Sequence, residues 1–430
     1  MFEQRLALSA EPLLLARRLA DRPYLSLFWS KNGSVAYLTC DPVEHSHALD
    51  PEPALALGAR TPEHAAPRWI GLLPYECRRA LERAGHGGSR AAPHLSEPHW
   101  LRYAAVAEIS QTGVRVIGDD VQAVTALAAR LRGPAPGSGA PGQSGGPGES
   151  GEPVELAPLR AFEAAELHRA RIRCALEHIR AGDLYQVNLA RRFEFRVRGS
   201  AVDVLARLLE RGRPPHAAAF AWGPLNVVSV SPELFVKIDT SGAIFTSPIK
   251  GTRPRGESPQ RDAELRLELD ADAKERAELT MVLDVERNDL ARLARPGTVR
   301  LSVPPHVEAH GTVLHRVATL QAELRAEPTR VEILERMLPS GSVTGAPKVR
   351  AMDLIAELEA ERRGLYTGAF GYLAHDGSLE LGMAIRTLTV RDGEGHYFAG
   401  GGIVADSDPE REVQETLWKA EALLGLLAKN

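Results

Sequence analysis

The chain has 430 residues, of which 44% are hydrophobic and 25% charged, and its formal net charge is −4. A chain of this length can bury a large core, and so small a net charge gives no support for nucleic acid or an anionic membrane as a main partner. The three cysteines are few, odd in number and far apart, so neither a disulfide framework nor a zinc site is indicated. Neither a membrane span nor a convincing secretory signal is visible, and we expect a cytoplasmic protein.

Residues 1–132 are expected to form the N-terminal part of the fold, with strands near 24–29 and 69–73. Three histidines of this part, His45, His47 and His64, are interpreted as scattered surface residues rather than metal ligands. No constellation of catalytic side chains stands out here.

Residues 133–153 consist almost entirely of Gly, Pro, Ala and Ser, a composition typical of a flexible linker. The stretch contains matches to the dinucleotide fingerprint and to a nucleophile elbow, but it lacks the flanking strand and helix that both need. We therefore discard both interpretations. The catalytic domain is placed at residues 154–430.

Beyond the linker the pattern becomes regular. Residues 162–181 have helical spacing and are followed by Gly182, which suits the residue after a helix end. Residues 185–197 alternate with period two, which predicts a strand with one buried face and one face toward solvent or a site. Gln186 and Asn188 share the polar face, where they could serve a ligand or simply meet solvent.

A lysine occupies the middle of residues 246–256, where two prolines and two glycines shape the backbone into an expected turn. Upstream, residues 231–238 and 243–245 predict a strand and its return strand, which could bring Glu233 close to Lys250. A carboxylate beside a desolvated lysine is one way to keep that amine neutral and nucleophilic. The alternative is an exposed lysine at the end of a strand.

Two acidic helices are predicted farther along. The first covers residues 270–293 and places Glu275 and Glu278 on one face. The second covers residues 407–427, begins with the capping-box pattern Ser407-x-x-Glu410, and carries Glu412, Glu415 and Lys419 on its polar face. Carboxylates from two helices suit a hard cation such as Mg²⁺, although an ordinary surface pair between Glu415 and Lys419 is equally compatible.

Between these helices, residues 339–348 form a loop of small residues before a helix, with Pro347 in the expected first helical turn. Its free N–H groups could receive a carboxylate or phosphate, with Ser342 or Thr344 adding a hydroxyl. Residues 379–387 alternate as a strand and place Arg386 where its guanidinium could bind a carboxylate. The three glycines at 400–402 would let the backbone approach a ligand closely.

Six blocks of this chain resemble, in the same order, the chorismate-utilising enzymes, and the resemblance runs over residues 160–425. The blocks are residues 183–189, 248–252, 284–289, 341–348, 384–387 and 400–407. The fold implied is α+β, a two-sheet antiparallel β sandwich with flanking helices and a site in a cleft between its halves. The lack of a repeating βαβ rhythm agrees with this class.

The resemblance also implies the members of the active site, although Gly382, Ser340 and Ala318 depart from the family pattern. The implied metal ligands for Mg²⁺ are Glu278 and Glu415, supported by Glu275 and Glu412; the catalytic residues are Lys250, Glu233 and His315; and the substrate-binding residues are Ser342, Thr344, Tyr366, Arg386, Gly401, Gly402 and Lys419.

Two positions separate the branches of this family. Members that add water carry a lysine base where this chain has Gln186, and anthranilate synthases usually carry alanine where this chain has Lys250. The resemblance therefore implies the aminodeoxychorismate synthase component I branch, which serves 4-aminobenzoate and folate synthesis. In that branch the lysine amine attacks C2 of chorismate, Glu233 helps the C4 hydroxyl leave, and ammonia then enters at C4. Anthranilate synthase component I and a chorismate-binding protein without activity are the alternatives.

The source of ammonia is a separate expectation. None of the three cysteines lies in a strand-turn-helix elbow, so this chain lacks a visible glutaminase nucleophile. Ammonia derived from glutamine would then require a separate amidotransferase subunit.

Overall fold

The computed structural model describes residues 1–30, 32–53, 66–77, 94–135, 154–157, 159–210, 212–311, 313–326, 328–359 and 361–427. Most of the predicted linker at residues 133–153 lies outside these ranges, as does His64. Among the residues described, no helix is both long enough and apolar enough to cross a membrane.

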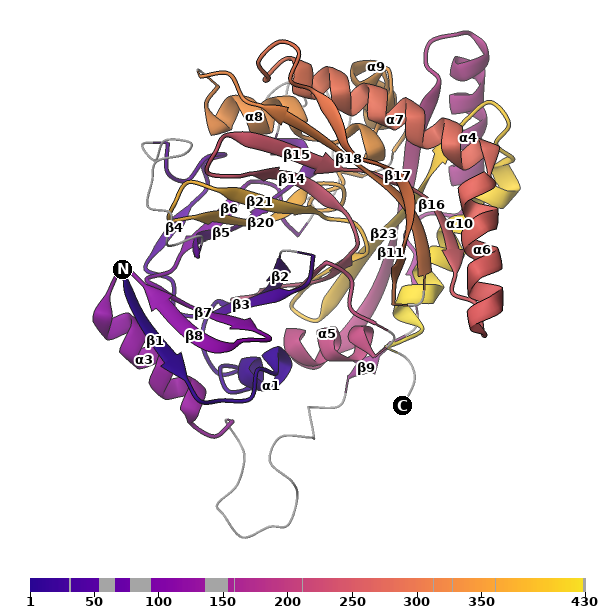
Figure 1. Cartoon of the computed structure of the whole chain (residues 1–430). Helices are drawn as coiled ribbons and strands as arrows, with labels where there is room; N and C mark the ends of the chain where they lie inside the picture. The colour runs from indigo at the N-terminus through magenta and orange to yellow at the C-terminus, as the bar shows by residue number, and fades with distance from the viewer. Residues whose placement is uncertain are drawn as a thin grey trace.

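Two antiparallel sheets form the framework of the described residues (Figure 1). The first has 13 strands, in the order β1 (Phe2–Leu6), β8 (Gly113–Gly118), β7 (Ala105–Ser110), β3 (Val35–Thr39), β2 (Leu25–Ser30), β12 (His216–Trp222), β13 (Leu225–Ser231), β22 (Thr387–Arg391), β23 (Glu394–Ile403), β11 (Gln186–Arg198) and β10 (Arg160–Ala161), with β9 (Glu155–Leu156) and β19 (Gly345–Ala346) also pairing with β11.

The second sheet has 10 strands, in the order β16 (Ile249–Pro254), β18 (Val313–Glu323), β15 (Ala243–Ser247), β14 (Leu234–Ile238), β21 (Leu379–Met383), β20 (Ala369–Ala374), β5 (Pro67–Leu73), β6 (His99–Arg102) and β4 (Glu44–Ser46), with β17 (Arg300–His310) also pairing with β18. The described helices are α1 (Pro12–Arg17), α3 (Val121–Arg132), α4 (Ala165–Arg180), α5 (Ala201–Leu209), α6 (Pro259–Ala271), α7 (Ala273–Ala291), α8 (Arg330–Met337), α9 (Lys348–Leu358) and α10 (Pro409–Leu424), with short 3-10 turns η1 (Tyr75–Cys77) and η2 (Gly341–Val343).

The two sheets enclose an aromatic core. Phe28 and Phe220 from the first sheet pack with Ile70, Phe370 and Tyr372 from the second. Helices α1, α3, α5 and α10 bury apolar faces against the first sheet, and α7 and α8 do so against the second. The predicted α+β fold, a two-sheet antiparallel β sandwich with flanking helices, is confirmed.

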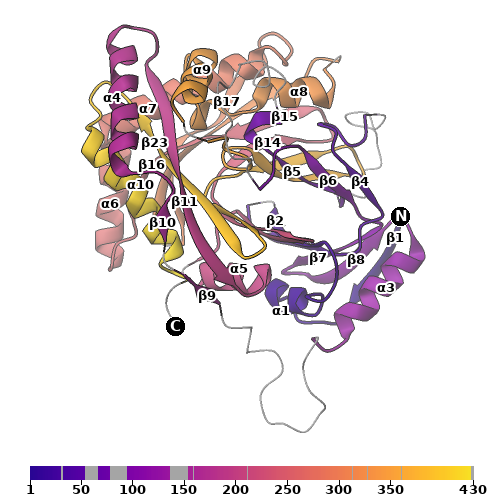
Figure 2. The same ribbon diagram turned by 180° about the vertical axis from the view of Figure 1, so that it is seen from behind.

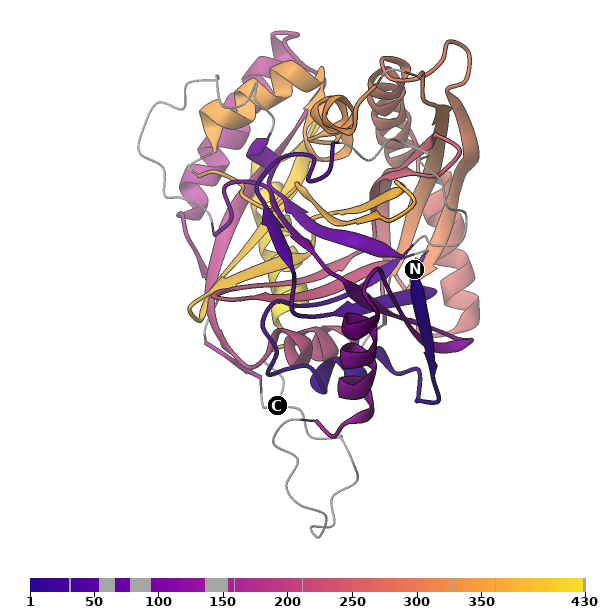
Figure 3. The same ribbon diagram turned by 90° about the vertical axis from the view of Figure 1, so that its left-hand side faces the viewer.

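Strands from the start of the chain complete both sheets. In the first sheet β2 pairs with β12, and in the second β5 pairs with β20. Figure 3 shows α3 and the N-terminal strands on the side of the molecule that faces the viewer. The described strands up to position 118 therefore form part of the same sandwich as the described strands beyond position 154.

Several predicted elements are confirmed, including strands near 24–29 and 69–73 and the helix over 162–181, which is followed by Gly182 at φ +83°. The strand predicted over 185–197 is β11, which lies beside β23 and near α4 and α10 (Figure 2). Its polar face is not open along its whole length. Gln186, Asn188 and Arg192 are buried, although α4, α9 and α10 pack against the opposite, apolar face at Val187 and Leu189. On the polar face Asn188 is hydrogen-bonded to Tyr366, and Arg192 lies over the Phe162 ring and pairs with Glu361.

The helix boundaries differ from the predictions because local caps set them. The acidic helix expected over 270–293 corresponds to α7, which begins at Ala273, whereas residues 270–271 are the end of α6. Asp272 between the two helices is extended and caps α7 by accepting from the N–H of Lys274 and Glu275. The cap of α10 is Asp408, so the expected Ser407 capping box is wrong. The Ser407 hydroxyl instead donates to Glu412, at 2.7 Å.

Candidate active site

Two neighbouring chain crossings between the sheets carry Glu233 and Arg386. Glu233 lies between β13 of the first sheet and β14 of the second, and Arg386 lies between β21 and β22. The strand predicted over 379–387 is therefore interrupted, and Arg386 adopts a left-handed φ of +50°. Because the crossings lie side by side, with backbone bonds from Met383 N–H to Glu233 O and from Val230 N–H to Arg386 O, they hold both side chains at one junction.

Lys250 lies in a strand rather than in the turn that was expected. It belongs to β16, which pairs with β18 and is irregular between Lys250 and Thr252. Gly251 in this bulge has φ +83°, and a Cβ there would lie 2.9 Å from Leu269 Cδ1 and 3.1 Å from Glu275 Oε2. A bulge changes the direction of neighbouring side chains. The irregular pairing at Gly251 therefore sets the direction of Lys250.

The Lys250 ammonium is enclosed by acidic and polar groups. Its Nζ donates to the carbonyl of Ser342 at 3.1 Å. Burial lowers the pKa of Lys250, while the charges of Glu278 and Glu233 raise it in part and Lys419 lowers it further. The alternative of an exposed lysine at a strand end is wrong, and Glu233 does lie near Lys250 as predicted.

Glu233 is 4% exposed, and its Oε1 accepts from the Ser342 hydroxyl at 2.7 Å. Burial raises the pKa of Glu233 to about 7, against the opposing effects of Ser342 and Lys250. The carboxyl therefore changes its protonation state near neutral pH, as a general acid or base requires.

The four glutamates predicted as metal ligands come from α7 and α10. Burial raises the pKa of Glu278, and the nearby charges of Glu275 and Glu415 raise it further. The pKa of Glu412 is raised by burial and by Glu415. Carboxylates of the two helices thus repel one another across the site, which is the electrostatic setting that a bound cation would relieve.

These carboxylates have protein partners in the structure. Glu415 pairs with Lys419 at 2.6 Å, and Glu275 with Arg253 at 3.4 Å. In the part of the chain that the structure describes, no three Asp, Glu, His or Cys side chains are grouped closely enough to hold a metal ion. The oxygen donors fit Mg²⁺ chemically, because that ion takes one or two carboxylates and fills its other positions with water and substrate.

Arg386 and His315 contact each other beside Glu233. Arg386 Nη2 lies 3.3 Å from His315 Nε2, and His315 Nδ1 lies 3.0 Å from Thr252 Oγ1. Burial lowers the pKa of His315 to about 3, so its ring is neutral. Because Arg386 can only donate, Nε2 is the acceptor and Nδ1 carries the proton.

The glycines of β23 border the same space. A Cβ on Gly401 would lie 2.9 Å from Glu412 Oε2, and one on Gly402 would lie 2.1 Å from Gln186 Nε2. Lys419 Nζ donates to the carbonyl of Gly400 at 2.8 Å. A side chain at position 401 or 402 would displace the ends of the Glu412 and Gln186 side chains.

Two of the predicted binding residues are held by their own hydrogen bonds. The Tyr366 side chain is hydrogen-bonded to Asn188, and its ring stacks on Phe398 with the ring centroids 5.3 Å apart. Burial raises the pKa of Tyr366. The Thr344 hydroxyl donates to the carbonyl of Ser340 at 2.8 Å and thereby braces the loop. The structure brings the predicted site residues into one region, and their roles stay predictions.

Sequence reasoning missed a buried carboxylate, Glu286 on α7, which is 1% exposed. It accepts from Thr246 Oγ1 at 3.1 Å and from the Ser340 hydroxyl. Its position was visible inside the block 284–289, at the spacing of the buried α7 residues Leu279, Val282 and Leu283. A charged residue at an apolar helical position is the signal that could have marked it.

Comparisons with known proteins agree on one family. A family model described as "chorismate binding enzyme" matches residues 16–425. Anthranilate synthase component 1 of Thermus thermophilus is 42% identical over 295 residues, covering 69% of this chain and 62% of that protein. Aminodeoxychorismate synthase component 1 of Escherichia coli is 41% identical over 264 residues, covering 61% of this chain and 58% of that protein.

Solved structures share the fold. Anthranilate synthase component I of Streptococcus pneumoniae has a TM-score of 0.73 at 27% identity, covering 94% of this chain and 90% of that one. The menaquinone-specific isochorismate synthase of Escherichia coli has a TM-score of 0.79 at 21% identity, covering 100% of this chain and 94% of that one, and supports the fold alone. The chain spans about half to three fifths of the length of the curated relatives it matches.

Proposed function

This chain belongs to the chorismate-binding enzymes, and on that premise we propose that it is an aminodeoxychorismate synthase component I. It would convert chorismate and ammonia to 4-amino-4-deoxychorismate. The observation that carries the proposal is Lys250, whose amine is enclosed beside Glu233 and Ser342 and has a pKa lowered by burial. A neutral amine is a nucleophile, whereas an ammonium ion is not.

The chain's own residues would act in two displacements. The neutral Lys250 amine attacks C2 of chorismate, and Glu233, protonated near neutral pH, gives its proton to the departing C4 hydroxyl. Ammonia then attacks C4, the bond to Lys250 breaks, and the excess proton of the new amine returns to Glu233. The proximity of Lys250 and Glu233 supports both steps, because one carboxyl serves as acid and then as base.

The carboxylates of chorismate require cationic partners. Arg386, held by His315, would bind one of them. We propose that Glu278 and Glu415, with Glu275 and Glu412, would hold Mg²⁺. When bound, that ion would supply positive charge to the other carboxylate of the substrate. Mutual repulsion between the carboxylates of α7 and α10 supports this assignment.

Ammonia from glutamine would come from a partner subunit. The relatives' names, which call them component 1, support a second component. Cys40 is a poor candidate for a glutaminase nucleophile, because burial raises its pKa to about 12 and such an enzyme needs a thiolate.

The test uses purified chain with chorismate, ammonium and Mg²⁺, and identifies the amine by mass spectrometry. Lys250→Ala should lower the rate of aminodeoxychorismate formation at least a hundredfold, about 3 kcal/mol of transition-state stabilisation. The protein is also incubated with chorismate in the absence of ammonia, the reaction is quenched, and the mass of the intact protein is measured. The wild type should then carry a covalent adduct and Lys250→Ala should carry none.

The matched control is Lys237→Ala, because Lys237 lies on β14 of the same sheet but has a 40% exposed side chain. It should leave both the rate and the adduct unchanged. An unaltered rate in Lys250→Ala would exclude the covalent mechanism.

The second candidate is anthranilate synthase component I, favoured by the 42% identity to the Thermus thermophilus protein of that name. Its product would be fluorescent anthranilate rather than an aminodeoxychorismate. If anthranilate is the main product of the wild type, the chain is an anthranilate synthase component I.

A further inference from the structure

A continuous chain of buried oxygen atoms links Glu233 to a second carboxyl that the proposed reaction does not use. Ser342 Oγ lies 2.7 Å from Glu233 Oε1, and Ser340 Oγ lies 3.0 Å from Ser342 Oγ. The Ser340 hydroxyl also contacts Glu286 Oε1. All four residues are buried, with Glu286 1% exposed and Ser342 the most exposed at 6%.

The three oxygen-oxygen contacts between Glu233 and Glu286 need three protons to become hydrogen bonds, whereas the two serine hydroxyls supply only two. With both carboxyls ionised, each serine donates to its own carboxylate, and no proton lies between the two serine oxygens. The Ser342 N–H donates to Ser340 Oγ at 3.1 Å and cannot fill that gap. One further proton, on either carboxyl, lets every oxygen-oxygen contact become a hydrogen bond, since a protonated carboxyl donates and a hydroxyl can donate and accept together.

The two carboxyls, Glu233 and Glu286, have different charged neighbours. Arg386 faces Glu233, and so does Lys250, which adds positive charge whenever its amine is protonated; both favour the ionised form of Glu233. Glu286 faces Asp289 and Lys348, which pair with each other at 2.7 Å. The charge of each carboxyl also raises the cost of ionising the other, as in other close carboxyl pairs.

We propose that Glu286 is the proton partner of Glu233, and that the two carboxyls share one proton through the hydroxyls of Ser342 and Ser340. When Glu286 holds the proton, it passes it to Ser340, Ser340 passes its own to Ser342, and Ser342 passes its own to Glu233. Three O–H bonds break and three form, with no change in oxidation state.

This inference rests on the proposed function at one point, the use of the proton. Glu233 gives the shared proton to the C4 hydroxyl, which leaves as water. The proton that ammonia sheds on becoming the C4 amine restores the shared proton. Glu286 is thus a positioning residue, because it acts through Glu233 and does not touch the substrate.

The kinetic test compares the pH dependence of kcat between the wild type and variants of the residues that link Glu233 to Glu286. Ser340→Ala removes the bridging hydroxyl and keeps both carboxyls, and Glu286→Gln removes the second carboxyl. Both should move the alkaline limb of the profile to lower pH by about one unit and lower kcat above neutral pH about tenfold, because Glu233 then loses its proton more easily. Ser340→Thr keeps a hydroxyl and should restore the wild-type limb.

The matched control is Thr246→Val, which removes the other hydrogen bond to Glu286, at 3.1 Å, and lies off the chain of hydroxyls. It should leave the alkaline limb in place. If Ser340→Ala and Glu286→Gln keep the wild-type limb while their thermal midpoints match that of Thr246→Val, the shared proton is excluded.

A second readout does not depend on the reaction. Infrared spectra of the wild type without substrate, at neutral pH, should contain a protonated-carboxyl band that shifts in D2O. Glu286→Gln and Ser340→Ala should weaken or shift this band, and Thr246→Val should retain it. Absence of the band in the wild type overturns the inference even if the enzyme makes aminodeoxychorismate. A different product with the band present rejects the proposed function and keeps the shared proton.

Discussion

Burial of single carboxyl and amine groups sets the expected pH dependence of the enzyme. The pKa of Glu233 is raised to about 7 by burial, and that of Lys250 is lowered by burial. The attack needs a neutral Lys250, so kcat rises as pH increases through the lowered pKa of that amine. The departure of the hydroxyl needs a protonated Glu233, so kcat falls as pH passes about 7. The profile should be bell-shaped, measured as product formed with saturating chorismate and ammonia.

A control variant separates the two limbs. Glu233→Gln cannot be ionised, so its residual activity should lack the alkaline fall and keep the acid rise. A wild-type rate that stays level well above neutral pH would contradict the assignment of Glu233 as the acid.

His315 is expected to position Arg386 rather than to exchange protons, since its ring is neutral and both nitrogens have partners. His315→Ala removes the acceptor that fixes the Arg386 guanidinium. We expect KM for chorismate to rise about tenfold with a smaller change in kcat, because the lost interaction serves ground state and transition state alike. Thr252→Val, which removes only the partner of Nδ1, should change KM less. A large fall in kcat at constant KM would instead indicate a catalytic His315.

At the scale of elements, the bulge in β16 is predicted to be necessary for aiming Lys250. Gly251→Ala places a side chain at φ +83°, against Leu269 and Glu275. We expect a loss of about 1–2 kcal/mol in the free energy of unfolding, from the left-handed backbone, and a fall in kcat of tenfold or more. Denaturant unfolding and steady-state kinetics measure the two effects.

Gly242 is the matched control for this change. It has φ +81° in the turn between β14 and β15, and a Cβ there would meet no atom within 4 Å. Gly242→Ala should show the same loss of unfolding free energy and full activity. Equal activity of Gly251→Ala and Gly242→Ala would show that the bulge is not needed to orient Lys250.

Helices and strands were predictable from the sequence where a local residue pattern determines them. Helix α4 and strands β2, β5 and β11 were predictable because periodicity of 3.6 or 2 lies in the local sequence. The ends were less predictable, because the start of α7 depends on the Asp272 carboxylate and that of α10 on Asp408. The break at residues 384–386 arises from a crossing between sheets, which alternation along one segment does not reveal.

For the whole molecule, the resemblance identified the region of the site, whereas the residues alone could not assemble it. Glu233 and Arg386 are neighbours because two chain crossings lie side by side, and Glu278 on α7 is near enough to Glu415 on α10 for the charge of Glu415 to raise its pKa. Glu286 stayed hidden for the same reason. Its partners Thr246 and Ser340 are distant in sequence, and only the packed fold shows that their hydroxyls reach it.

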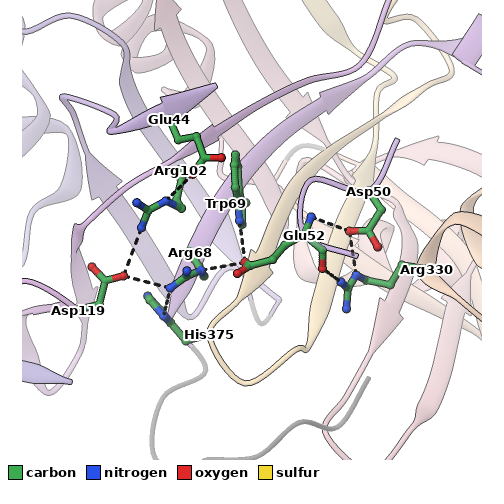
Figure 4. Close-up of polar contacts among 9 residues, drawn as sticks. All are labelled: Glu44, Asp50, Glu52, Arg68, Trp69, Arg102, Asp119, Arg330 and His375. Atoms are coloured by element: carbon green, nitrogen blue, oxygen red, sulfur yellow. Dashed lines mark hydrogen bonds and ion pairs between the residues drawn. The ribbon is translucent and has the colours of Figure 1, made fainter. Parts of the chain in front are cut away.

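The sandwich also depends on a polar network between the start of the chain and α8, drawn in Figure 4. Arg330 Nε donates to Asp50 at 3.2 Å, and both side chains are less than 5% exposed. Glu52 accepts from Arg68 and from Trp69 Nε1, each at 2.8 Å. These contacts fasten residues 50–52 to β5 and to α8.

Arg330→Met keeps an apolar stem and leaves the Asp50 carboxylate buried without its cation. Removing one partner of a buried pair costs about 3–5 kcal/mol, so the free energy of unfolding should fall by that amount. Arg196→Met is the matched control, because Arg196 pairs with Glu394 at 3.4 Å on the surface, with side chains 76% and 65% exposed. It should change stability by less than about 1 kcal/mol. Equal unfolding midpoints for the two variants in urea would show that the network does not hold the N-terminal strands in the sandwich.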